Sequence, residues 1–215
     1  MPRLLLLQND PTVGEHLRRA IGAMPDMQVS GMAVTLPQAV LSMQLCSPDL
    51  VLVDLQVKRA ELETLLDELC SLPRDSRPLV LVGALSLDDP SLMEAIAQGA
   101  DGYYLHGSSP ETLRGAIYQV LAGESPMAPT IARQTKLLFE APAWNSEGFD
   151  GDTREALRLS EAQLRILERI GEGYLVHEVA RELQTTEHEV GLGIRTLYRK
   201  LQFDRRAAAM AGQLT

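Results

Sequence analysis

Short uninterrupted apolar runs recur through the first half of the chain. The clearest are LLLL at 4–7, LVLV at 50–53 and LVLV at 79–82. Runs of this length without polar alternation are typical of strands buried on both faces of a parallel sheet. With two less regular stretches, they predict five strands, at 4–7, 27–34, 49–54, 78–82 and 102–105.

Between these runs, apolar residues recur every three or four positions, which is the helical period. The pairs Asp10–Pro11, Asp89–Pro90 and Ser109–Pro110 each offer a capping side chain followed by the residue preferred at the first helical position. Two further helices are expected at 37–46 and 60–72. Five strands alternating with five helices predict an α/β doubly wound parallel sheet.

The pattern changes after residue 124. A helix over 130–139 is possible, whereas Pro142, Asn145, Gly148 and Gly151 indicate a solvated linker in which Trp144 is a docking contact. We therefore expect a first domain at 1–124, a linker at 125–157 and a second domain at 158–215.

The second domain is predicted to be all helical. Ser160 caps a helix that ends near Gly171 and Gly173, and a short helix follows at 176–183. Thr186 and Glu189 form a capping box that opens the next helix, at 187–201, and a separate last helix is expected at 205–213. In the helix at 187–201 one apolar stripe is expected, formed by Val190, Ile194, Leu197 and Leu201. Two helices joined by a tight turn and flanked by supporting helices indicate a helix-turn-helix domain.

Charge is distributed unevenly along the 215 residues, which carry 20 basic and 29 acidic side chains. The net charge is about −7 over 1–140, about −3 over 141–156 and about +1 over 157–215, so only the last part could approach a polyanion without strong repulsion. Cys46 and Cys70 have no metal-ligand spacing and are expected to be reduced thiols. The four leucines at the start are too few for a signal sequence or a membrane span, so we expect a cytoplasmic protein with no membrane association.

Three phrases of the sequence resemble the NarL/FixJ-type response regulators, in which a receiver domain precedes a LuxR-type helix-turn-helix. They are PDLVLVDL, GADGYYLHGSSPETLRGAIYQVLAGE and the segment from LSEAQLRILERIGEGY through HEVARELQTTEHEVGLGIRTLYRKL. The resemblance implies a flavodoxin-like receiver of strand order 2-1-3-4-5 and a small all-α domain that binds DNA as a dimer.

The chain departs from this family at the site that would accept a phosphoryl group. Asp54 occupies the acceptor position, but the family's acidic pair falls on Gln8 and Asn9, its hydroxyl on Gly83 and its lysine on His106. Tyr103 occupies the aromatic switch position and is expected to be a fixed packing residue. Neutral amides remove two charges from the expected Mg²⁺ site, so phosphoryl transfer should be severely impaired. Asp10 could replace one of them, but its place before Pro11 favours the capping role.

Asp54 has two possible roles without phosphate. It could pair with a protonated His106 or with an amide of Gln8 or Asn9, or it could be a hydrated remnant of the family's site. The sequence does not decide between these roles.

The resemblance also places a reading helix at 187–201. Five outward positions are candidates for DNA contact, namely His188, Leu192, Arg195, Arg199 and Lys200. Relatives usually carry a lysine at the Gly191 position and often another at the His188 position. The arginines could instead form a solvated face paired with nearby glutamates.

The leading hypothesis is a dimeric transcription regulator that works independently of aspartyl phosphorylation. The alternative is a regulator that has lost specific DNA binding and titrates a protein partner, which Glu187, Glu189, Gly191 and Gly193 on the expected reading helix favour. We expect no enzymatic activity, no cofactor and no metal, because the sequence shows no metal-ligand cluster, no phosphate-binding glycine loop and no nucleophile spaced from a base.

Overall fold

The computed structural model describes residues 1–73, 76–141 and 157–212. They form two compact units, Met1–Ala122 and Gly123–Thr215, within two residues of the expected end of the first domain. The linker positions around Trp144 lie outside the described residues. No helix in the part of the chain that the structure describes is both long enough and apolar enough to cross a membrane.

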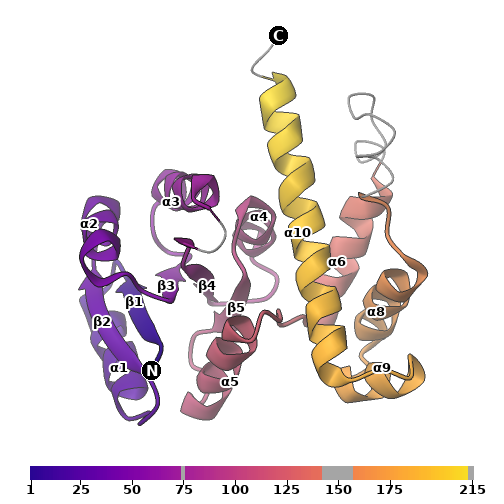
Figure 1. Cartoon of the computed structure of the whole chain (residues 1–215), viewed down its shortest axis with the longest axis horizontal. Helices are drawn as coiled ribbons and strands as arrows, with labels where there is room; N and C mark the ends of the chain where they lie inside the picture. The colour runs from indigo at the N-terminus through magenta and orange to yellow at the C-terminus, as the bar shows by residue number, and fades with distance from the viewer. Residues whose placement is uncertain (74–75, 142–156, 213–215) are drawn as a thin grey trace. The chain divides into compact units, whose positions relative to one another are not determined.

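The first unit is a five-stranded parallel sheet of order β2-β1-β3-β4-β5, as expected. The strands are β1 (Arg3–Leu7), β2 (Gln28–Ala33), β3 (Leu50–Asp54), β4 (Leu79–Ala84) and β5 (Gly102–Leu105). Helices alternate with them as α1 (Pro11–Gly22), α2 (Leu36–Cys46), α3 (Arg59–Ser71), α4 (Pro90–Gln98) and α5 (Pro110–Leu121) (Figure 1). The doubly wound, flavodoxin-like fold is therefore confirmed.

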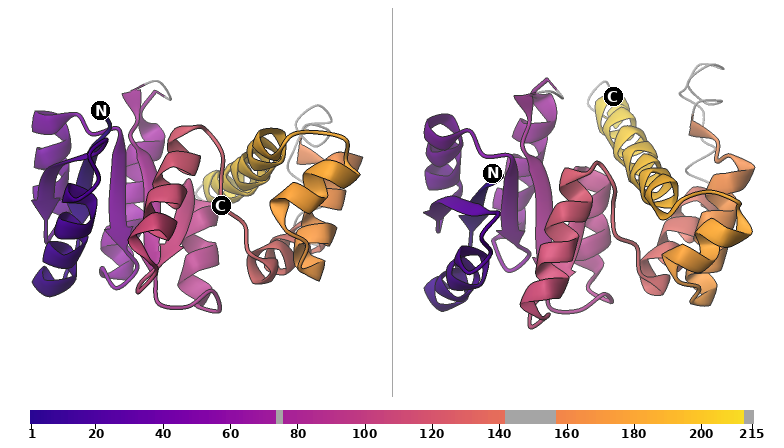
Figure 2. Two further views of the ribbon diagram at one scale, coloured as in Figure 1. Left: turned by 90° about the horizontal axis from the view of Figure 1, so that it is seen from below. Right: turned by 60° about the horizontal axis from the view of Figure 1, so that its bottom comes forward.

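Helices cover both faces of this sheet (Figure 2). On one face, Leu17 and Ile21 of α1 pack with Leu113 and Ile117 of α5 against β1, β3 and β4. Helices α2, α3 and α4 follow one another on the opposite face. All four leucines of the run at 4–7 are fully buried, because this central strand has neighbours on both sides and a helix layer on each face.

The expected caps position the helices that border the carboxyl edge of the sheet. Asp10 accepts a hydrogen bond from the Thr12 amide at 2.7 Å, and Pro11 follows at the first helical position of α1. Asp89 and Ser109 cap α4 and α5 in the same way. The chain thus leaves each strand and turns into its helix within a few residues, so the strand ends and helix starts lie together.

The second unit contains α6 (Pro129–Glu140), α8 (Glu161–Glu172), α9 (Val176–Glu182) and α10 (Glu187–Gly212). The possible helix at 130–139 is α6, but it packs against α8 and is not part of a free linker. The Arg133 guanidinium donates to the Gly171 carbonyl at 2.6 Å, and the Lys136 ammonium donates to Glu168 at 2.9 Å. The expected linker at 125–157 is therefore wrong over its first part.

Helix α10 is a single helix of 26 residues, whereas two helices were expected, at 187–201 and 205–213. The sequence between them, Gln202, Phe203 and Asp204, contains neither glycine nor proline, so no residue there ends the helix. The expected separate helix at 205–213 is therefore the C-terminal part of α10 as far as Gly212. The end of an apolar stripe does not end a helix, because the backbone hydrogen bonds can continue beyond it.

Candidate functional site

The carboxyl edge of the sheet brings together the side chains expected from the sequence. Asp54 is the last residue of β3, pairs in register with Gly83 of β4, and has an exposed fraction of only 4%. Its Oδ1 atom accepts a hydrogen bond from the Gln56 amide at 2.9 Å. His106 directly follows β5, and its Nε2 atom lies 3.3 Å from the same Oδ1 atom. This distance is that of an ion pair when the imidazole is protonated, although the two groups are not aligned as a hydrogen bond.

The end of β1 supplies amides to this edge, and its one carboxylate is already used. Gln8 is buried, with 1% of its surface exposed, and the Asn9 side-chain amide donates to the Gln56 carbonyl at 3.0 Å. Asp10 is the N-cap of α1, as the Pro11 that follows it predicted. Among the residues that the structure describes, Asp54 is therefore not joined by the acidic pair expected at this position, and carboxylates are the protein ligands that Mg²⁺ usually binds.

Gly83 leaves room on β4 that the aromatic ring of Tyr104 fills. A Cβ atom built on Gly83 would lie 2.6 Å from the Tyr104 hydroxyl oxygen and 2.8 Å from its Cζ atom, which is closer than real carbon contacts allow. The family's hydroxyl side chain at this position could not coexist with that ring. A phenol hydroxyl consequently stands where the resemblance predicted a threonine or serine.

Tyr104 is a site residue that the sequence reasoning missed in favour of its neighbour Tyr103. Side chains alternate along a strand, so Tyr104 and His106 share a face of β5 whereas Tyr103 points to the other face. The ring centroids of Tyr104 and His106 lie 5.3 Å apart, edge to face. Burial raises the pKa of the Tyr104 phenol, and the Asp54 carboxylate raises it further, so the group remains a hydroxyl donor. Tyr103 is also buried, and its role as a packing residue stays a prediction.

The charges at this edge determine what it can do chemically. Within residues 1–73, 76–141 and 157–212, no three His, Cys, Asp or Glu side chains are grouped so that they could hold a metal ion. A carboxylate that attacks a phosphoryl group needs nearby positive charge to stabilise the transferring oxygens. His106 is the one imidazole within 4 Å of Asp54 among the described residues, and it is cationic only when protonated. In this structure the Asp54 carboxylate is thus held by the Gln56 amide and lies beside an imidazole.

The second unit contains the expected helix-turn-helix, formed by α9, a turn and α10. The Thr186 hydroxyl accepts from the Glu189 amide at 3.1 Å, and the Glu189 carboxylate accepts from the Thr186 amide at 3.0 Å. This is the predicted capping box, and the Thr185 hydroxyl also donates to Glu189. Together with the amide and hydroxyl of Thr186, that hydroxyl lowers the pKa of Glu189. The start of the expected reading helix is thus firmly defined.

His188 and Gly191 both contact Glu124, which belongs to the segment that enters this unit. The His188 Nδ1 and Glu124 Oε1 atoms lie 2.6 Å apart. A Cβ atom on Gly191 would lie 2.7 Å from Glu124 Oε2, so the Glu124 side chain would have to shift before a larger residue could stand at this position. The next residue, Ser125, donates its amide to the Gly191 carbonyl at 3.3 Å. Glu124 was not identified from the sequence, because nothing local indicates that a residue 64 positions away packs on this helix.

Arg195 does not point outward as expected. It follows Gly191 by one turn, on the stripe that also carries Tyr198, and its exposed fraction is 4%. The Tyr198 hydroxyl donates to the Pro126 carbonyl at 2.7 Å, so the segment at 124–126 follows this stripe for two turns. The helix therefore has two buried stripes and not one, and the assignment of Arg195 to an exposed DNA-contacting position is wrong for this conformation.

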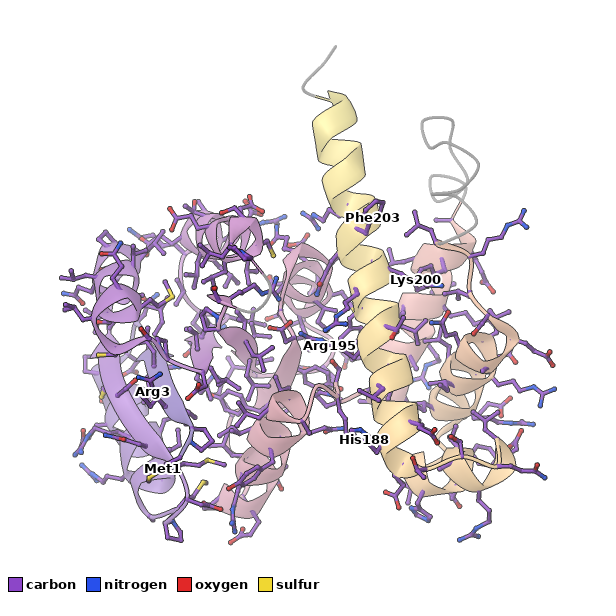
Figure 3. The ribbon with its side chains drawn as sticks, viewed as in Figure 1. Met1, Arg3, His188, Arg195, Lys200 and Phe203 are labelled. Carbon is purple, nitrogen blue, oxygen red and sulfur yellow. The ribbon has the colours of Figure 1, made fainter. Side chains whose placement is uncertain are left out.

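The remaining candidate DNA-contacting residues on α10 differ in their exposure and in their bonds to other residues. Figure 3 shows His188, Arg195 and Lys200 in this order along the helix. Leu192 has 39% of its surface exposed and Arg199 is exposed, as expected. Lys200 is half-buried and donates to the Arg158 carbonyl and, at 3.0 Å, to Gln163 Oε1. Burial lowers the pKa of Lys200. Leu192 and Arg199 are thus exposed, His188 is exposed but held by Glu124, and contact of these residues with DNA stays a prediction.

Comparison with known proteins gives relatives along nearly the whole chain. No family model matches. The nitrate/nitrite response regulator protein NarL of Escherichia coli K12 is 28% identical over 207 residues, which cover 96% of this chain and 92% of that protein. The DNA-binding transcriptional activator DevR/DosR of Mycobacterium tuberculosis is 24% identical over 209 residues, covering 97% and 92%. The crystal structure of the response regulator ChrA, from a heme-sensing two-component system, covers 97% of this chain with a TM-score of 0.51 at 20% identity.

Proposed function

We propose that this chain, a homologue of the NarL-type response regulators, is a transcription regulator that binds promoter DNA as a dimer without phosphorylation of Asp54. Its relatives along the whole length are transcription regulators, and its fold is a receiver joined to a helix-turn-helix unit. The proposed independence from phosphate rests on the neighbours of Asp54. Two amides replace the acidic pair of the family, a glycine replaces its hydroxyl residue, and a histidine replaces its lysine.

Physical chemistry supports this proposal at each position. Mg²⁺ is held mainly by carboxylates and waters, and Asp10, the nearest candidate carboxylate in sequence, is committed to the cap of α1. Without the metal and the lysine, charge developing on the transferring phosphoryl oxygens is poorly compensated. Removing one such electrostatic contact commonly slows a reaction by about 100-fold or more, so several losses together leave little activity.

The direct test is intact-mass spectrometry of the full chain after incubation with acetyl phosphate and Mg²⁺. We expect no mass increase of one phosphoryl group under conditions in which a response regulator with an intact acidic pair is modified. Asp54→Asn serves as the matched control, because it removes the acceptor oxygen from a site of unchanged size. A phosphoryl adduct present in the parent protein and absent from Asp54→Asn would refute the proposal.

Dimeric DNA binding rests on a different argument. A helix-turn-helix places its second helix in the major groove, and dimers read two half-sites related by the two-fold axis of the operator. DevR/DosR is named a DNA-binding activator. Fluorescence anisotropy with genomic fragments at several salt concentrations, together with light scattering of the free and bound protein, tests both parts. We expect a saturable complex of two chains per site.

A second candidate function is a regulator that binds a protein in place of DNA. The observation that favours it is the state of the expected reading helix, where Glu124 contacts His188 and Gly191, Arg195 is buried and Lys200 is bound to the start of α8. The same titration separates the two functions. If no genomic fragment binds more tightly than random DNA at any salt concentration, protein interaction becomes the better interpretation.

A further inference from the structure

A cavity of about 670 Å³ opens beside Asp54 at the carboxyl edge of the sheet. Its apolar wall comes from α1 and α5, with Val13, Leu17 and Ala20 from the first helix and Pro110 and Leu113 from the second. Cavities of roughly 300 to 1,000 Å³ with apolar walls and a few polar groups are typical of sites for small organic molecules. The volume alone therefore suits a ligand much larger than a phosphoryl group.

A buried polar group in the cavity wall points to a ligand independently of the volume. The Tyr104 side chain lines the cavity, has 5% of its surface exposed, and its hydroxyl makes no hydrogen bond with any residue that the structure describes. Buried hydroxyls without a partner are rare, because removing a hydroxyl from water without a replacing hydrogen bond is unfavourable. A ligand atom that accepts or donates a hydrogen bond would satisfy it.

The charged groups around the cavity indicate which ligands fit. The carboxylates of Asp54 and Asp10 and the imidazoles of His16 and His106 lie in its wall, and none of the described residues that line it is a lysine or arginine. A phosphate or carboxylate would meet a buried carboxylate with no fixed cation to offset it. An uncharged or cationic molecule would instead find an acceptor in Asp54.

A larger hollow, of about 910 Å³, lies at the opposite edge of the sheet, but three of its charged groups, Arg3, Asp49 and Arg77, already have partners. Arg77 pairs with Asp101 at 2.8 Å, and the Asp49 carboxylate accepts from the Arg3 amide at 2.7 Å. None of the described residues that line that hollow has a buried polar side-chain atom without a hydrogen-bond partner, as the Tyr104 hydroxyl is. The smaller cavity is therefore the better candidate for a binding site.

We propose that the crevice beside Asp54 binds a small uncharged or cationic organic molecule with an apolar body. The apolar body packs between α1 and α5, its hydroxyl or ammonium group donates to Asp54, and the Tyr104 hydroxyl completes the polar contacts. This inference rests on the proposed loss of phosphoryl transfer at Asp54, because the same carboxylate cannot serve both purposes at once.

Three probes with the same phenyl body test the proposal on the full chain. They are 2-phenylethylamine, 2-phenylethanol and phenylacetate, and their binding is measured by saturation-transfer NMR and by titration of protein amide resonances. We expect the amine and the alcohol to saturate one site and phenylacetate to bind at least about tenfold more weakly, a difference of about 1.4 kcal/mol. Asp54→Asn should weaken amine binding about tenfold and leave alcohol binding within about threefold.

Cavity variants show whether the probes occupy this crevice. Ala20→Trp fills the space at α1 and should abolish binding of both probes, whereas Leu41→Trp, at an exposed position of α2, should leave it unchanged. Tyr104→Phe removes only the hydroxyl and should weaken binding several-fold, which keeps the test decisive if Ala20→Trp fails to fold. Absence of saturable binding, equal binding of phenylacetate, or binding insensitive to both cavity variants would overturn the inference. The assay contains neither DNA nor a phosphodonor, so its failure is distinct from failure of the proposed function.

Discussion

One aromatic ring determines what the end of β4 can hold. The Tyr104 hydroxyl occupies the space beside Gly83 in which a side chain would otherwise stand, so the identity of residue 83 depends on a residue of the neighbouring strand. The loss of the family's hydroxyl is therefore built into the packing of the receiver. This coupling makes a specific prediction about stability.

Gly83→Ala should destabilise the first unit by about 1–3 kcal/mol, because the added carbon overlaps the Tyr104 ring in a packed core. The matched control is Gly115→Ala on α5, where nothing lies within 4 Å of the added carbon. The control should gain about 0.5–1 kcal/mol of helix stability. Urea denaturation measures both changes.

Combining Gly83→Ala with Tyr104→Leu tests whether this contact is the cause. The double variant should be more stable than the sum of the two single changes predicts, because the shorter side chain removes the overlap. Strictly additive effects would show that Gly83 is required for another reason.

Most residues at this edge of the sheet could be placed from the sequence, for a physical reason. Asp54 ends β3, Gly83 is the last residue but one of β4, and His106 directly follows β5, and strand ends of a parallel sheet meet at one edge. Tyr104 could have been found from the alternation of side chains along β5. Its fit against Gly83 could not, because it depends on the spacing between two strands.

Helix ends were the most predictable features at the scale of the element. The cap of α1 by Asp10 and the box between Thr186 and Glu189 are local hydrogen bonds that a few adjacent residues determine. The length of α10 was not predictable in the same way. Its apolar stripe ends at Leu201, while the helix itself continues to Gly212.

The cap of α10 can be tested with two Thr→Ala substitutions, one at the cap and one within the same helix. Thr186→Ala removes the hydroxyl that accepts from the Glu189 amide and should cost about 1 kcal/mol of unfolding free energy. Thr196→Ala removes a hydroxyl that donates to the Leu192 carbonyl within the helix, and its effect should stay within about 0.5 kcal/mol. Thermal unfolding followed by circular dichroism distinguishes the two, and equal effects would argue against a capping role.

The same cap predicts a dependence on pH. Hydrogen bonds from Thr185 and Thr186 lower the pKa of Glu189 below its ordinary 4.5, so the carboxylate favours the folded state above that value. This contribution should disappear as the pH falls from 4.5 through the lowered pKa of the folded protein. The free energies of unfolding of Glu189→Gln and of the parent, measured between neutral and acidic pH, check this expectation. If the stability advantage of the parent grew as the pH fell, the expectation would be wrong.

At the scale of the whole molecule, charge limits how this protein can meet DNA. The chain carries a formal net charge of −9, so a polyanion can approach only where basic residues are exposed. Of the three basic residues expected to contact DNA, Arg199 is exposed, whereas Arg195 is buried and Lys200 is bound to α8. We therefore expect few phosphate contacts and a shallow dependence of binding on salt.

Arg199→Ala should weaken DNA binding across sequences and reduce the slope of log K against log salt by about 1, as expected for one phosphate contact. The control is Arg18→Ala, which removes an arginine from α1 that pairs with Glu15 in the first unit. That change should leave the slope unaltered. Anisotropy titrations at four or more salt concentrations measure it, and an unchanged slope in Arg199→Ala would remove this residue from the DNA interface.

The contact between Gly83 and Tyr104 also restricts how phosphate acceptance could return by mutation. Replacing the glycine first would crowd the ring, and restoring the acidic pair or the lysine first would leave no room for the hydroxyl. The tyrosine would have to be exchanged before any threonine or serine became tolerable at position 83, and that exchange alone restores no chemistry. If the proposed independence from phosphate is correct, regaining the hydroxyl at position 83 therefore needs a change at Tyr104 that brings no benefit by itself.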